Sequence, residues 1–113
     1  MIKVHVPRKN LAEGLGHVER VVPSRSSNPN LSLVRLSLHE DSLSLSGSNL
    51  DSDLEVVIPA DVSAEGSYAI PAQVFAQIVR ALPGEMVELE FREHELELSS
   101  GSYATKLQLA ETG

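Results

Sequence analysis

The chain has 113 residues, a formal net charge of −7 and no cysteine. This length fits one domain with its own core, and the lack of cysteine excludes disulfides, thiolate metal sites and a cysteine nucleophile. The polar N-terminus does not read as a signal peptide and no apolar run is long enough to span a membrane, so we expect a cytoplasmic protein.

In chain order, the first half predicts a strand, a helix and then three strands. Alternating apolar residues mark the strands, and leucines and valines at helical spacing mark the buried side of the helix. The alternation changes phase near Val34, which predicts either a bulge or a strand buried on both faces. The expected ranges are 2–6, about 8–22 for the helix, 31–38, 43–47 and 54–58.

After a polar link over residues 60–65 the same order begins again. The second helix is the clearest element of the chain, with Pro71 in its first turn and Pro83 and Gly84 at its end. Its apolar stripe has the spacing i, i+3, i+4 and i+7 and consists of Phe75, Ile78, Val79 and Leu82. Strands are expected on either side of it, over 67–70, 87–91, 96–98 and 103–109.

The predicted fold class is therefore α+β, with the order βαβββ written twice in a single domain of residues 1–113. The halves span about 1–59 and 66–110. Repetition of this kind implies a pseudo-symmetric domain in which two amphipathic helices pack side by side on sheet. Their polar faces would then point the same way.

The sequence holds no pattern that marks a catalytic or metal site. The four histidines lie in separate elements without ligand spacing. Asp51, Asp53 and Glu55 alternate along one strand but do not match a calcium loop, so a solvated strand face explains them better. The glutamates between residues 85 and 97 fit outward positions that keep a sheet soluble. We therefore expect no enzyme activity, no metal and no cofactor.

The polar faces of the two helices form the candidate binding surface. Charge is uneven along the chain, because the first 30 residues are basic and the remainder is strongly acidic. The helices contribute hydrogen-bond donors and cations without aromatic side chains, which suits phosphate contacts on a duplex better than stacking on single-stranded bases. Gly14 and Gly16 serve either packing or the approach of DNA. The candidate DNA-binding residues are Lys9, Arg20, Gln73, Gln77 and Arg80.

Four stretches, taken together, resemble the bacterial sliding clamp, the beta subunit of DNA polymerase III, over its N-terminal domain only. Their order and spacing cover nearly the whole chain in register. The stretches are PNLSLVRL (29–36), SGSNLDSDLEV (46–56), IPAQVFAQIVRALPG (70–84) and LELSSGSYATKL (96–107).

The resemblance implies the DNA-clamp fold, with three such domains per subunit and a homodimer that closes head-to-tail around double-stranded DNA. The helices would line the hole, and the pocket for the polymerase and the clamp loader would lie in later domains. We therefore expect this chain to be the first third of a longer subunit.

The resemblance also implies site residues. Arg25, in the loop after the first helix, corresponds to a DNA contact, and Gln73 stands where family members carry an arginine near DNA. Ile78 and Leu107 match subunit-interface positions, with Val74 beside them. For Ile78, a place in the core is the rival interpretation.

The function predicted is that of a non-catalytic DNA polymerase processivity factor. The alternative is a small protein-interaction module that uses its sheet edges and has no nucleic-acid role. A carboxylate hydrolase is a third interpretation, which would require turnover that is lost when a pair of glutamates between 88 and 97 is neutralised.

Overall fold

Two helices and nine strands make up the described parts of the chain, which are residues 2–22, 33–48 and 53–109 of a computed structural model. The predicted order is confirmed, and one short strand is added between the halves. The elements are β1 Ile2–Pro7, α1 Arg8–Val21, β2 Leu33–Leu38, β3 Ser42–Ser48, β4 Asp53–Pro59, β5 Asp61–Val62, β6 Gly66–Pro71, α2 Ala72–Ala81, β7 Met86–Phe91, β8 Glu95–Ser100 and β9 Tyr103–Gln108.

The strands form two antiparallel sheets, and each half of the chain gives its first strand to the other half's sheet. The five-stranded sheet has the order β5-β1-β7-β8-β9, and the four-stranded sheet has the order β4-β3-β2-β6. Ile2 of β1 pairs with Phe91 of β7, and Val34 of β2 pairs with Ile70 of β6. The two halves are therefore joined by hydrogen-bonded sheet as well as by their connection in the chain.

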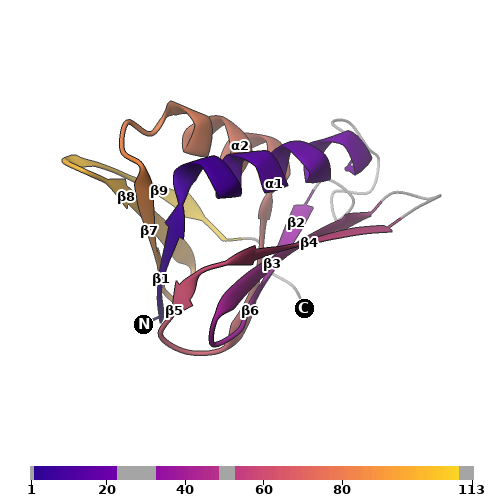
Figure 1. The fold of residues 1–113 in the computed structure, drawn as a ribbon, viewed down its shortest axis with the longest axis horizontal. Coiled ribbons are helices and arrows are strands. Elements are labelled where there is room, and N and C mark those ends of the chain that lie inside the picture. The colour runs from indigo at the N-terminus through magenta and orange to yellow at the C-terminus, as the bar shows by residue number, and fades with distance from the viewer. Residues whose placement is uncertain (1, 23–32, 49–52, 110–113) are drawn as a thin grey trace.

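The helices lie side by side and cover both sheets, as Figure 1 shows. Each follows a proline that ends a strand. Pro7 and Pro71 have φ values of −62° and −56°, close to the value that a helix needs. The prediction that Pro71 lies in the first turn is wrong by one residue, because Pro71 still pairs with Leu33 in the sheet and α2 begins at Ala72.

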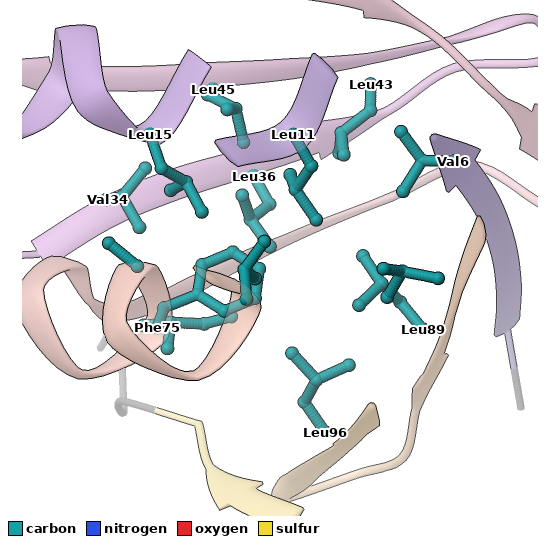
Figure 2. Packing of buried hydrophobic residues seen from close by; sticks show 14 of the residues in the cluster. Val6, Leu11, Leu15, Val34, Leu36, Leu43, Leu45, Phe75, Leu89 and Leu96 are labelled. Carbon is teal, nitrogen blue, oxygen red and sulfur yellow. The ribbon is translucent and has the colours of Figure 1, made fainter. Parts of the chain in front are cut away.

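One hydrophobic core fills the space between the helices and both sheets. Phe75 of α2 lies at its centre among leucines from α1 and from the two sheets (Figure 2). Ile78, which the sequence placed in the same stripe as Phe75, is only partly buried and packs at the edge of this core.

The prediction of a bulge or two-sided burial in β2 is wrong. β2 pairs with β6 in unbroken register from Leu33 to Leu38, and Arg35 on its outer face is exposed. The apparent phase change arises because Leu33 is an apolar residue on that outer face, whereas Val34 is buried. The predicted link over 60–65 also differs, because Val62 of β5 pairs with Val4 of β1.

Gly14 is a packing residue, which answers one of the questions that the sequence left open. It is buried where α1 crosses β3 and β4. A Cβ at this position would lie 2.8 Å from Cδ1 of Ile58 and 2.9 Å from Cδ1 of Leu45. Only a glycine lets α1 approach the sheet this closely without those side chains moving.

A hydrogen-bond relay ties the start of α1 to the loop after α2. The Arg8 guanidinium Nε donates to the Gly84 carbonyl at 3.0 Å, and the Arg8 backbone N–H donates to the Glu85 carbonyl at 2.8 Å. The Gly84 backbone N–H donates in turn to Oγ of Ser100 at 2.7 Å. Ser100 is only 2% exposed, so water cannot easily take the place of its Oγ as the acceptor for the Gly84 N–H.

Ser100→Ala is therefore expected to destabilise the fold by about 1–3 kcal/mol, because the Gly84 N–H loses its acceptor. Urea unfolding measures the change. Ser99→Ala is the matched control, since Ser99 lies next to Ser100 but on the opposite face of β8, and it should change stability by less than about 0.5 kcal/mol. Equal losses from the two variants would contradict the role given to Ser100.

Candidate nucleic-acid interface

The exposed sides of α1 and α2 hold the five candidate residues that the structure describes. They come from the two helices that lie next to each other, and all five are exposed. On each helix they lie away from the buried stripe, which on α1 includes Leu11 and Leu15 and on α2 includes Phe75. The residues are Lys9, Arg20, Gln73, Gln77 and Arg80.

The three cations of this surface are not equivalent. Within the described part of the chain, Lys9 and Arg20 form no ion pair. Arg80 reaches across to α1, where its Nη2 lies 2.5 Å from Oε1 of Glu19. The sequence did not predict this pair, because the two residues are 61 positions apart. Arg25, the loop residue assigned a DNA contact, lies outside the described residues.

The predicted interface residues lie on α2 and on an edge strand. Val74 and Ile78 are one helical turn apart on α2, and Val74 is 44% exposed. Leu107 is partly buried on β9, where it pairs with the buried Leu96 of β8. β9 ends the order of the five-stranded sheet, so one of its sides has no partner strand among the residues described.

The outer face of the five-stranded sheet is charged and internally paired. Glu90 lies directly opposite Glu97, an arrangement of like charges that is unfavourable by itself. Arg92 compensates, with guanidinium nitrogens 3.1 Å from Glu90, 3.4 Å from Glu97 and 3.2 Å from Glu95. The hydrogen bond to the Glu95 carboxylate raises the pKa of Arg92 further above its ordinary value.

These glutamates do not form the isolated pair that a carboxylate hydrolase needs, because three of them share one arginine. Alternation of residue types in the sequence placed these glutamates outward and Arg92 on the same side as Glu90, but only the pairing of β7 with β8 brings Arg92 to Glu97. The four histidines are all exposed. In residues 2–22, 33–48 and 53–109, no three side chains of the types His, Cys, Asp or Glu gather closely enough to hold a metal ion.

Neither of the helices described has the length and apolar character that crossing a bilayer requires.

A family model described as the DNA polymerase III beta subunit, N-terminal domain, matches residues 2–111. The beta sliding clamp of Caulobacter vibrioides is 37% identical to the chain over 91 residues, which are 80% of this chain and 24% of that protein. The beta sliding clamp of Streptomyces coelicolor is 33% identical over 88 residues, covering 78% of this chain and 23% of that protein. The chain thus spans about a quarter of the length of these curated relatives.

Solved structures give the same result for the fold. The DNA polymerase sliding clamp of Caulobacter crescentus superposes with a TM-score of 0.89 at 32% identity, covering 97% of this chain and 30% of that chain. The sliding clamp of Bacillus subtilis superposes with a TM-score of 0.91 at 26% identity, covering 97% of this chain and 31% of that chain. The predicted DNA-clamp fold, with two helices on antiparallel sheets, is confirmed.

Proposed function

This chain belongs to the family of the DNA polymerase III beta subunit, matching its N-terminal domain, and from that premise we propose that it is a section of a ring-shaped processivity clamp. The ring encircles double-stranded DNA, slides along it without reading its sequence, and holds the replicative polymerase to its template. Because it works by enclosure, the chain carries out no reaction and needs no cofactor. Its place of action is the cytoplasm, where bacterial DNA is replicated.

The observation that carries the proposal is the contrast between the two sides of the fold. The helix side presents more cations than carboxylates together with exposed amides, whereas the outer face of the five-stranded sheet presents more glutamates than cations. A duplex is attracted to the first surface and repelled by the second. This supports a ring with α1 and α2 lining the hole and the sheets outside.

In this arrangement Lys9 and Arg20 contact phosphates directly, and Gln73 and Gln77 donate uncharged hydrogen bonds. Arg80 lies between the helices, and Arg25 adds a contact from the loop after α1. Phosphate contacts position a protein on DNA without sequence information. Few and weak contacts are what a sliding ring requires, since strong ones would hold it in place.

The ring closes through a partner subunit. We place Val74, Ile78 and Leu107 at this contact, because they offer apolar surface beside the edge strand β9. The polymerase and the clamp loader bind elsewhere in the subunit, in parts that this chain does not include. One copy of residues 1–113 would then provide one of three similar domains.

The test is to measure the dissociation constant for a short DNA duplex at several salt concentrations. Binding is monitored by NMR, because that method detects weak complexes. The dissociation constant should rise with salt, and each phosphate contact adds about 0.9 to the slope of its logarithm against the logarithm of salt concentration. Lys9→Gln combined with Arg20→Gln is therefore expected to lower that slope by roughly 1.8.

The matched control is Lys3→Gln combined with Lys106→Gln, which removes the same charge from β1 and β9, where both lysines lie on the outer row that includes Glu90 and Glu97. The control should leave the slope unchanged. If both double variants lower the slope equally, or if the wild-type chain shows no salt-dependent binding, the protein-interaction module becomes the better account.

A further inference from the structure

The ion pair between Arg80 and Glu19 is the only one that joins α1 to α2 within the described residues. It sits at the exposed seam between the two helices, where the Arg80 side chain is 49% exposed and the Glu19 side chain 25% exposed. A guanidinium in this position can reach either of two acceptors. One is the Glu19 carboxylate and the other is a phosphate that approaches the helix surface.

Gly16 lies beside the Arg80 side chain, near the point where it reaches Glu19. The nearest atom to a Cβ built on Gly16 is Nη2 of Arg80, at 3.6 Å. This is ordinary van der Waals distance, so an alanine would also fit here, and it places the guanidinium next to α1 about one turn before Glu19. This assigns Gly16 a place in the seam between the helices, whereas Gly14 packs against the sheet.

Glu19 changes what the helix surface offers to a polyanion. Lys9 and Arg20 are unpaired among the described residues, but Arg80 already has a carboxylate partner. We propose that Glu19 competes with DNA phosphate for Arg80 and so lowers the affinity of the surface for a duplex. This inference rests on the proposed function, since it requires that the helix surface meets DNA.

The competition is finely balanced because exposed ion pairs are weak. A phosphate can displace Glu19 from Arg80 when the surface approaches DNA closely, and Glu19 recovers the guanidinium when the phosphate moves away. The contact between Arg80 and a phosphate is thus made and released while the Arg80 side chain stays between α1 and α2. Glu19 acts as a tuning residue that limits how tightly the helix surface holds any one phosphate.

The experiment compares Glu19→Gln with Glu13→Gln in the 113-residue chain, titrated with a short duplex at several salt concentrations. Both variants remove one negative charge from α1, but Glu13 is exposed and forms no ion pair in the described part of the chain. Glu19→Gln should tighten binding at 50 mM salt at least about threefold more than Glu13→Gln, and should steepen the salt slope by about 0.9.

The same two substitutions are then made in an Arg80→Gln background. There they should have equal effects on affinity and slope, because only the general charge change remains. Urea unfolding of each variant shows whether the fold is intact. The excess effect of Glu19→Gln in the presence of Arg80 is the quantity that a purely structural role of Glu19 would not produce.

Two outcomes would overturn the inference alone. One is that Glu19→Gln and Glu13→Gln have the same effect in the wild-type background. The other is that Glu19→Gln weakens binding, which would mean that Glu19 holds Arg80 in place for the phosphate. A wild-type chain without salt-dependent duplex binding would overturn the proposed function as well, so the two failures are distinguishable.

Discussion

Replacing Phe75 by alanine is expected to lower the free energy of unfolding by about 3–5 kcal/mol, as measured by urea denaturation. Phe75 is fully buried and is among the largest side chains of the core. It projects from α2 between α1 and both sheets (Figure 2). Removing its ring therefore leaves a cavity that a shift of any one helix or strand would not fill. A domain of ordinary stability has about 5–15 kcal/mol in total, so this loss brings it close to unfolding.

Val74→Ala is the matched control for this prediction. Val74 is the preceding residue of the same helix, but it is 44% exposed. Truncating it should change the free energy of unfolding by less than about 0.5 kcal/mol. Losses of similar size at the two positions would show that α2 does not pack on the core through the face that contains Phe75.

Dividing the chain between its two halves is expected to abolish folding of each half alone. The cut falls after Ala64, an exposed residue between β5 and β6. The fragment of residues 1–64 then has β1 without its partner β7, and β2 without its partner β6. The fragment of residues 65–113 has the complementary defects. Each fragment would expose half of the core that the two share.

When mixed, the fragments should assemble and regain the circular dichroism and dispersed NMR spectrum of the whole chain. The control is the intact chain carrying a protease site after Ala64. If it is cut after folding, it should keep the native spectrum. A dispersed spectrum from either fragment alone would show that the halves are separate folding units and would contradict residues 1–113 as a single domain.

Much of the fold follows from residue patterns that concern one element at a time. Alternation identified the faces of the strands, and helical spacing identified buried residues such as Leu11, Leu15 and Val18. Such patterns show whether a side chain faces the core or the solvent.

They do not show which strands pair with each other. No pattern in β1 distinguishes β7 from β2, so the exchange of strands between the halves could not be predicted.

The errors have the same origin. The phase change in β2 suggests a bulge or burial on both faces because Leu33 is apolar, yet an exposed sheet face tolerates single apolar residues. β5 was missed because two residues are too few to show alternation, and only the pairing of Val62 with Val4 makes them a strand.

For the candidate site, helical spacing gave the positions of Lys9, Arg20 and Arg80 on outward faces, and the structure places all three there. It could not give the neighbour of Arg80, because Glu19 lies on the other helix and on the flank of its polar face. The family resemblance supplied Arg25, which lies outside the described residues, and the assignments of Ile78 and Leu107, which stay predictions. Sequence patterns therefore predicted the exposed face of each helix but not the contacts between side chains of different elements.

The exchanged strands also set the order in which a ribosome can build this fold. β1 pairs along its whole length with β7, so Ile2 must wait for Phe91 to be synthesised before that ladder can form. At about 5–20 residues per second, the nascent strand spends several seconds without that neighbour. Val4 and Val6, which are fully buried at the end, are exposed during this time. Contacts this distant in sequence slow folding, and the five-stranded sheet can be completed only after β9 has been synthesised.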